Sequence, residues 1–471
     1  MEFADFILAH DGDDLGALAL ARDRYAGEVE DFDLALTTLE VRRKLRTKVP
    51  EWYAVPGLRY PLRLSGEQCS SAETARYKAL VAAMAVGEPL AVADLTGGLG
   101  VDSWAFAQVA TEVLYNEMRP DLADAARANF AVLGVKNIAV RNSALVPSSL
   151  VPASEPEFPA ASVSQILGDF RPDVIFLDPA RRASDGRKVF RLEDCQPAVL
   201  SLLPELFAAC PRLLLKLSPM ADISLVCKQL GSVKEVHIVA ADGECKELLL
   251  LLERDYVGPY SLTIYENGEA MNVSGDSEGY QAPAGARPYP GLCASKVMEG
   301  EKAAGDNRGQ RPLKGATLGH VRGRGPQAEG AVGGAGAKRR RFGDVSLPPA
   351  SECMFEPGKA LLKAGAFELP CQYGLDKLGR HTHLYVGPEV PEELKPFGKC
   401  FRIIEMAPLN KRNIKDIGTR YPSASVTARN IPLTSDQLRA KLHVADGASV
   451  HIFGVQVDAL NAHYLLVCIT A

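Results

Sequence analysis

The sequence has no excess of positive charge, no cysteines spaced as CxxC and no long apolar run. Its 471 residues carry 53 Lys and Arg against 58 Asp and Glu, a formal net charge of −5. This charge excludes a basic nucleic-acid footprint over the whole chain and leaves only a local patch open. The ten cysteines lack the spacing of a zinc ribbon, so we predict no metal site. The most apolar run, Leu248–Leu252, is far too short to cross a bilayer and predicts a buried strand.

A secretory leader is also not expected. The first residues, MEFADFILAHDGDD, have no basic segment followed by a long apolar core. Scattered cysteines without such a leader are typical of reduced, mostly buried thiols. The sequence therefore predicts a cytoplasmic protein with no membrane partner.

The chain is long enough for two to four domains at roughly 100–200 residues each. Residues 1–88 have helical patterns, including Asp31–Lys48 and a helix with capping-box spacing at Ser70 and Glu73, and predict a helical N-terminal extension. In residues 89–277, short apolar runs alternate with helix-like stretches, which predicts an α/β core with a mainly parallel, doubly wound sheet. The runs EVHIVA and ELLLLLE allow a hairpin, with an antiparallel strand at the end of the sheet.

Two further segments follow the predicted core. Residues 278–348 are rich in Gly, Pro, Arg and Ala and predict a disordered insert, because they offer too little apolar surface to fold. Residues 349–398 and 399–471 contain alternating runs and one helical stretch, LTSDQLRAKL, and predict a small α+β C-terminal region.

A glycine-rich turn between a strand and a helix is the strongest chemical signal. In AVADLTGGLGVDS, Asp94, Thr96, Gly98 and Gly100 fit the D/E-x-G-x-G-x-G loop of adenosylmethionine-binding folds, with Thr96 at the first glycine position. Glycines there, Gly97 included, let the chain turn sharply and let a ligand lie against bare backbone. In such sites Asp94 would order the loop and hold the amino-acid part of the cofactor.

An acid at the end of the next strand supports this interpretation. Glu117 follows Asp94 by 23 residues and could accept hydrogen bonds from both ribose hydroxyls of an adenosine ligand. A dinucleotide is the rival ligand, but it needs Gly or Ala where Ser103 stands, and Asp102 would repel its pyrophosphate. Adenosylmethionine carries no phosphate and tolerates these acids, so we count Asp102 among its candidate binding residues. A glycine turn without any ligand is the third alternative.

The stretch DVIFLDPARR predicts the place of the reaction. Its strand ends at Asp178 and Pro179, and ligands of open α/β sheets bind beyond the carboxyl ends of the strands. Asp178 could accept an N–H or O–H from a methyl acceptor, while Arg181 and Arg182 could bind a phosphate or carboxylate of the substrate. The alternative is that both arginines only solvate a loop.

Four stretches together resemble a known family: QCSSAETARYK, DLTGGLGVDSWAFA, FLDPARR, and KLSPMADI with ECKELL. They are similar to class I S-adenosyl-L-methionine-dependent methyltransferases with a THUMP-like C-terminal region. EPGKALLKAGAFELP, HTHLY and VTARNIPL resemble the small ferredoxin-like and THUMP-like parts of that family. The resemblance implies a Rossmann-like methyltransferase core in residues 89–277, a ferredoxin-like segment in 349–398 and a THUMP-like domain in 399–471. It also implies methyl transfer, with RNA, such as tRNA or rRNA, as partner.

The sequence departs from the family pattern in three places. The position of the acid that often binds the adenine amino group falls near Asn142 and Ser143. Asp169 could substitute for that acid, but we expect it to begin the turn into the DVIFLD strand. No aromatic residue follows Asp178 and Pro179, which weakens methylation of an exocyclic amine. No cysteine lies in the loop after LLLKLSPM, which disfavours methylation at uracil C5.

Basic residues in the tail provide the local patch that RNA binding would need. They are Lys395, Lys399, Arg402, Lys411, Arg412, Lys415, Arg420 and Arg429. Phosphate contacts of this kind position a nucleic acid without reading its sequence, but a solvated surface has the same composition. Two alternatives therefore stay open, which are a methyltransferase for protein or small molecules and a non-catalytic RNA-binding protein.

Overall fold

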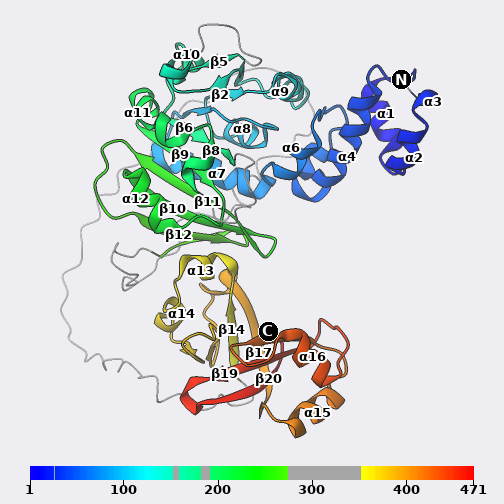
Figure 1. Ribbon diagram of the computed structural model, residues 1–471, viewed down its shortest axis with the longest axis vertical. Helices are drawn as coiled ribbons and strands as arrows, with labels where there is room; N and C mark the ends of the chain where they lie inside the picture. Colours follow the sequence, from blue (N-terminus) through cyan, green and yellow to red (C-terminus); the bar gives the residue numbers. More distant parts are fainter. Residues whose placement is uncertain (26, 152–158, 182–190, 274–351) are drawn as a thin grey trace, which may run out of the picture.

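The computed structural model describes residues 1–25, 27–151, 159–181, 191–273 and 352–471 (Figure 1). Within these residues the largest sheet has nine strands in the order β13-β12-β10-β11-β9-β6-β1-β2-β3. The strands are β1 (Ala91–Asp94), β2 (Glu112–Glu117), β3 (Ile138–Asn142), β6 (Val174–Leu177), β9 (Arg212–Leu217), β10 (Val233–Ala241), β11 (Glu244–Glu253), β12 (Ser261–Glu266) and β13 (Glu269–Asn272). The helices that alternate with them are α8 (Val101–Phe106), α9 (Pro120–Val132), α10 (Val163–Leu167), α11 (Val199–Ala209) and α12 (Ile223–Leu230). Short pairs β4 (Ala144–Leu145) with β5 (Ala160–Ala161) and β7 (Ala180–Arg181) with β8 (Cys195–Gln196) lie outside this sheet.

In the sheet, β11 runs antiparallel to both of its neighbours, β9 and β10, and β13 runs antiparallel to β12. β1 pairs in parallel with β2 and β6, and β6 with β9, so the carboxyl ends of these strands meet at one edge. The predicted hairpin forms from β10 and β11 around Asp242 and Gly243. Its predicted place at the end of the sheet is wrong, because β11 lies between β9 and β10 and β13 ends the sheet. The leucines of β11 are buried on both faces, which only an interior strand can provide.

The N-terminal part consists of helices that extend from the core (Figure 1). They are α1 (Phe3–His10), α2 (Leu15–Leu20), α3 (Arg22–Tyr25), α4 (Phe32–Lys48), α5 (Pro50–Tyr53), α6 (Arg63–Gln68) and α7 (Ala72–Val86). α1, α2 and the first half of α4 share a small apolar cluster, while α5 and α7 pack on the large sheet. The N-cap of α7 is Ser71, whose hydroxyl accepts from the N–H of Thr74, and not Ser70 as the capping-box spacing suggested.

The C-terminal part contains a second sheet in the order β15-β16-β14-β17-β20-β19-β18. Its strands are β14 (Cys353–Pro357), β15 (Asp376–Lys377), β16 (Tyr385–Gly387), β17 (Gly398–Pro408), β18 (Ser425–Arg429), β19 (His451–Val457) and β20 (Ala462–Thr470). Its helices are α13 (Lys359–Ala364), α14 (Leu369–Gln372), α15 (Lys411–Arg420) and α16 (Ser435–Leu442). The helix predicted at LTSDQLRAKL is α16, which begins with a full capping box at Thr434 and Gln437.

Hydrogen bonds and a shared apolar cluster join the two sheets. The carboxylate of Glu266, at the end of β12, accepts hydrogen bonds from the N–H groups of Lys359 and Ala360 in the first turn of α13. A Cβ on Gly358 would lie 2.1 Å from this carboxylate, so only glycine fits there. Phe355 and Leu361 share one apolar cluster with the strands of the large sheet. The C-terminal part is therefore fixed against the core.

The predicted fold class is confirmed: an α/β core of Rossmann-like methyltransferase type, a helical N-terminal extension and a small α+β C-terminal region. The predicted disordered insert, 278–348, lies outside the described residues. Among the described helices, none is both long and apolar enough to cross a membrane. The cytoplasmic location stays a prediction.

Candidate active site

The glycine loop between β1 and α8 is packed tightly against aromatic rings. A Cβ on Gly97 would lie 2.1 Å from the ring of Tyr115, whose hydroxyl donates to the carbonyl of Gly98 at 2.7 Å. Gly100 has φ +93°, and its Cβ would lie 2.8 Å from Phe130. Gly97 and Gly100 are thus required by protein rings under the loop as well as by its turn.

Asp94 orders this loop from below. It is fully buried, its Oδ1 accepts from the N–H of Thr96 at 3.1 Å, and its Oδ2 accepts from the hydroxyl of Ser103 at 2.6 Å. Burial raises the pKa of Asp94 to about 7, although both hydrogen bonds favour the charged form. The part of the prediction that Asp94 orders the loop thus has a structural basis, whereas its side chain does not face outward.

Thr96, at the first glycine position, connects the loop to the next strand. Its hydroxyl accepts a hydrogen bond from the backbone N–H of Asp178 at 2.6 Å. Glycine could not make this bond. The threonine therefore fixes the end of β6 beside the loop.

Glu117 ends β2 directly beneath the loop, at the carboxyl edge of the sheet. Its Oε2 accepts from the N–H of Gly98 at 2.9 Å, and its Oε1 accepts from the N–H of Arg119 at 2.9 Å. Burial raises the pKa of Glu117, and the N–H groups of Arg119 and Gly98 oppose that rise. Each carboxylate oxygen keeps a further lone pair for another donor.

Ser143 follows β3 at the same edge. Its N–H donates to the carbonyl of Glu117 at 3.1 Å, and its hydroxyl donates to the carbonyl of Asn142 at 2.7 Å. Asp169 is exposed in the segment before β6, as expected for a residue that begins the turn into that strand, and it lies at the opposite edge of the sheet from Ser143. Ser143 stays the candidate near the position of the adenine-binding acid.

Asp178 and Pro179 follow β6 at the carboxyl edge. The side chain of Asp178 is 35% exposed, whereas Pro179 is buried. The backbone of Arg181 continues into β7, which pairs with β8. Arg182 lies outside the described residues. The structure thus brings Asp178 next to the glycine loop through Thr96.

Three charged residues that sequence reasoning did not select complete this edge: Lys78 of α7, Lys216 of β9 and Glu247 of β11. The ammonium of Lys216 lies 2.5 Å from Oδ2 of Asp178 and 3.9 Å from Oε2 of Glu247. The fully buried ammonium of Lys78 lies 3.0 Å from Glu247 and 3.0 Å from Asp102. These five charges, Asp102, Lys78, Glu247, Lys216 and Asp178, form a chain of alternating sign, which we call the charge chain.

Ser70 joins the charge chain at its inner end. Its hydroxyl donates to Oδ2 of Asp102 at 2.8 Å and accepts from the ammonium of Lys78 at 2.7 Å. Asp102 thus contacts Ser70 and Lys78, and its assignment to the cofactor site stays a prediction. Each of the four stretches that carried the family resemblance contributes to this chain. Lys216, within the run LLLKL, and Glu247, directly before the run LLLLL, were the signal in the sequence, because a charge on a buried strand needs a partner.

The charges in the charge chain shift one another's pKa values. Burial would raise the pKa of Asp102, but Lys78 and Lys216 outweigh it and lower that pKa. Burial raises the pKa of Glu247 against the same two lysines. Burial would lower the pKa of Lys216, but Asp178, Glu247 and Asp102 outweigh it and raise that pKa. Lys216 is therefore a stable cation at neutral pH.

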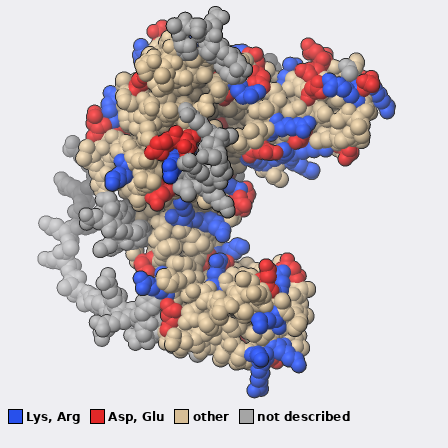
Figure 2. All heavy atoms as spheres, viewed as in Figure 1, with Lys and Arg blue, Asp and Glu red and all other residues tan. Residues whose placement is uncertain are grey.

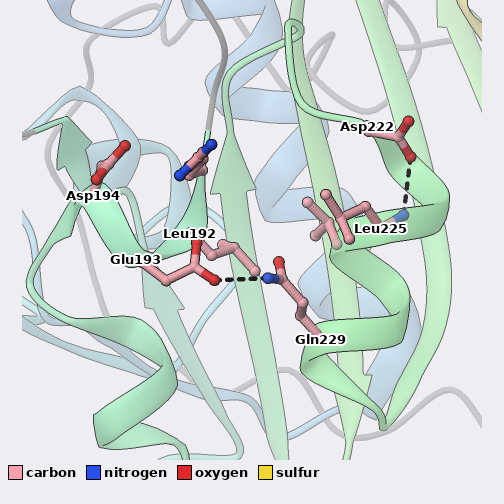
Figure 3. Close-up of a pocket in the computed structure, with 8 residues that line it drawn as sticks. Leu192, Glu193, Asp194, Asp222, Leu225 and Gln229 are labelled. Atoms are coloured by element: carbon pink, nitrogen blue, oxygen red, sulfur yellow. Dashed lines mark hydrogen bonds between the residues drawn. The ribbon is translucent and has the colours of Figure 1, made fainter. Parts of the chain in front are cut away.

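A cavity of about 440 Å³ lies next to this edge, between α12 and the 3₁₀ turn Leu192–Asp194 (Figure 3). Within it, Gln229 donates to Glu193 at 2.7 Å, and Asp222 caps α12 by accepting from the N–H of Leu225 at 2.9 Å. None of the predicted site residues lines it. Among the described residues, no group of three or more His, Cys, Asp or Glu side chains is arranged to hold a metal ion.

Comparisons with known proteins agree with this architecture. Residues 354–394 match a ferredoxin-like domain, and residues 398–469 match a THUMP domain-like family. The whole chain aligns with a crystal structure from Porphyromonas gingivalis W83, provisionally described as a methyltransferase, with TM-score 0.67 and 25% identity, covering 100% of this chain and 97% of that chain. The chain has a methyltransferase fold. The resemblance to class I methyltransferases with ferredoxin-like and THUMP-like C-terminal parts is confirmed.

Other solved structures align with a smaller part of the methyltransferase fold. A T. thermophilus 16S rRNA N2 G1207 methyltransferase, in complex with AdoMet and guanosine, aligns at TM-score 0.28 and 16% identity, covering 39% of this chain and 43% of that chain. A Streptococcus mutans protein, provisionally described as a methyltransferase and in complex with SAH, aligns at 0.26 and 12%, covering 38% and 95%. These scores are too low to support an argument about the site. No curated protein matches the chain.

Proposed function

We propose that the protein is an S-adenosyl-L-methionine-dependent methyltransferase that acts on RNA, such as tRNA or rRNA. One observation carries the proposal. The carboxylate of Glu117 accepts from the N–H of Gly98, and the backbone N–H of Asp178 donates to the hydroxyl of Thr96, so both acids are tied to the same glycine loop. A cofactor held by the first acid would therefore lie beside an acceptor held by the second.

The donors and acceptors of the loop fit this cofactor better than a dinucleotide. The N–H groups of Thr96, Gly97, Gly98 and Gly100 already donate to protein oxygens. A pyrophosphate would need such groups free. The loop instead lies among carboxylates, which suit a cationic ligand. Glu117 would hold the ribose hydroxyls, and Ser143 would lie near the adenine.

When bound, adenosylmethionine supplies a methyl group on a positively charged sulfur. Asp178 would accept an N–H or O–H of the acceptor and so orient its nucleophilic atom toward the cofactor. The buried Pro179 fixes the turn that presents this carboxylate. Arg181 would contact the phosphate of the substrate. The proton that the acceptor atom loses on methylation would pass to the carboxylate of Asp178 and from there to water.

A basic helix in the THUMP-like part supports RNA as the substrate. Lys411, Arg412 and Lys415 are exposed on α15, and no ion pair joins them to any described residue. Figure 2 shows a group of Lys and Arg side chains at the place where Figure 1 shows α15. Cations in the first turns of a helix oppose its dipole, so helix stability does not explain them. Binding to the phosphate groups of RNA would explain these three cations.

The same assignment proposes a division of labour along the chain. Residues 89–277 would carry the chemistry, residues 349–398 would connect, and residues 399–471 would bind RNA. The helical extension, residues 1–88, would close the core through Lys78 and Ser70, which join the charge chain.

The test supplies methyl-labelled adenosylmethionine together with RNA extracted from cells that lack the protein. Label in RNA, lost after ribonuclease treatment and absent without enzyme, supports the proposal, and digestion to nucleosides then identifies the modified base. Label in protein or small molecules would favour the other methyltransferase alternative. RNA binding without any transfer would identify a non-catalytic protein and overturn the proposal.

A further inference from the structure

Lys216 points at the exposed member of the charge chain and not at the buried one. Its ammonium lies 2.5 Å from Oδ2 of Asp178 but 3.9 Å from Glu247. Glu247 and Asp102 already have Lys78 within 3.0 Å each. Asp178 is 35% exposed and could be solvated by water without a partner. The need to pair a buried charge therefore does not explain the direction of Lys216.

The placement of Lys216 carries a cost that calls for a reason. It stands in the leucine strand β9, opposite Leu249 of β11, with only 14% of its side chain exposed. An apolar residue at this position would pack on both neighbours without desolvating a charge. The ammonium nevertheless reaches the carboxyl edge, where the proposed acceptor lies.

The pair leaves hydrogen-bonding capacity on both partners. Among the described residues, Lys216 donates only to Asp178, and Oδ1 of Asp178 accepts from none. An ammonium has three N–H groups and a carboxylate oxygen has two lone pairs. A free acceptor and free donors therefore stand side by side at the edge.

We infer that Lys216 is a positioning residue for the acceptor, and that with Asp178 it recognises a nucleobase edge presenting an N–H beside a carbonyl or ring nitrogen. This inference rests on the proposed function. Lys216 would hold Oδ2, leave Oδ1 for the N–H of the base, and donate to the neighbouring oxygen or nitrogen. Bases displayed in this way are read on their hydrogen-bonding edges.

The experiment compares full-length wild type with Lys216→Met, Lys216→Arg, Asp178→Asn and the double variant Lys216→Met/Asp178→Asn. The probe is RNA extracted from cells that lack the protein, with kcat and KM measured alongside calorimetric affinity for S-adenosylhomocysteine and the melting temperature. Lys234→Met is the matched control, because Lys234 pairs with Glu253 at the opposite edge of the same sheet.

We expect Lys216→Met to lower kcat about 100-fold, since small misplacements of reacting groups have effects of that size. Cofactor affinity should stay within about twofold, and Lys216→Arg should recover part of kcat because it restores the charge. The double variant should be no slower than Asp178→Asn alone, because both changes disable one pair. Lys234→Met should behave as wild type.

Wild-type kcat in Lys216→Met, or losses that multiply in the double variant, would overturn the inference while the proposed function stands. A wild-type protein that transfers no methyl group to RNA would instead overturn the proposed function, and this inference with it. If Lys216→Met does not fold, Lys216→Met/Glu247→Gln, which removes one charge of each sign, is compared with Glu247→Gln. Equal kcat in those two variants would also overturn it.

Discussion

The hydroxyl of Ser103 donates a hydrogen bond to Oδ2 of Asp94 at 2.6 Å. Ser103 occupies the position where a dinucleotide-binding loop needs Gly or Ala to let its helix approach the strand. Here the serine at that position instead fixes the side chain of Asp94, the acid that orders the loop. The residue that argued against a dinucleotide from the sequence thus has a structural task of its own.

Asp94 should make stability depend on pH. Its pKa rises from 3.8 in a free side chain to about 7 in the folded protein, because burial disfavours the charge. The folded state therefore holds the proton more tightly, and the contribution of Asp94 to stability falls as pH rises from about 4 to about 7. Relative to Asp94→Asn, the wild type should lose up to roughly 4 kcal/mol over this range. Urea unfolding at pH 4 and pH 8 measures this difference, and an equal change in both proteins would contradict it.

Glu117→Ala should weaken cofactor binding. The change removes the carboxylate proposed for the ribose hydroxyls, which corresponds to about 1.5–3 kcal/mol for hydrogen bonds to a charged group. Calorimetry with adenosylmethionine and S-adenosylhomocysteine measures it. Glu112→Ala is the control, because Glu112 is exposed at the other end of β2. Binding of NADH in place of both ligands would exclude this assignment.

Gly97→Ala should destabilise the fold even without a ligand. Its Cβ would lie 2.1 Å from the buried ring of Tyr115, so the loop or the ring must move. Overpacking of this kind typically costs about 1–3 kcal/mol. Thermal unfolding provides the measurement, with Gly12→Ala as control because nothing lies within 4 Å of its Cβ. An unchanged melting temperature would show that the loop adapts freely.

Asp178→Asn should reduce turnover and leave cofactor affinity largely intact. The change keeps the shape of the side chain but removes the charge that pairs with Lys216, and losses of this kind run about 10²–10⁴-fold. Arg181→Ala should act mainly on KM for RNA, through a lost contact to phosphate. Steady-state kinetics separates the two effects. If Asp178→Asn transfers methyl groups at the wild-type rate, the acceptor is held elsewhere.

Replacing Lys411, Arg412 and Lys415 together by alanine should weaken RNA binding and its dependence on salt. Each lost phosphate contact makes the slope of log K against log salt shallower by about 0.7–0.9, so the triple variant should lose about 2–3. Filter binding at several salt concentrations measures the slope. Lys136→Ala, an exposed lysine before β3, should keep the wild-type slope. Equal slopes in all three proteins would remove α15 from the interface.

The sequence predicted those parts of the site that are encoded locally. The glycine loop, Glu117 at the end of β2 and Asp178 at the end of β6 each follow from a short pattern and the rule that ligands bind at carboxyl edges. The charge chain does not, because Lys78 and Glu247 are 169 residues apart and meet only through the order of the strands. The order of the strands in the sheet also places β11 in its interior, which a local pattern does not predict. The capping-box spacing predicts Ser70 as a helix cap. Its hydroxyl instead bonds to Asp102, and a local pattern does not reveal a partner 32 residues away.

The junction at Glu266 fixes the distance between the C-terminal part and the core. Because the carboxylate caps α13 and the apolar cluster continues across the junction, α15 and the carboxyl edge of the large sheet keep a set separation. Domains with a large apolar interface do not swing freely. On the proposed function, an RNA bound at α15 would reach Asp178 only if the stretch between its two contact points had the right span. Substrates would then be selected by their dimensions before any base is read.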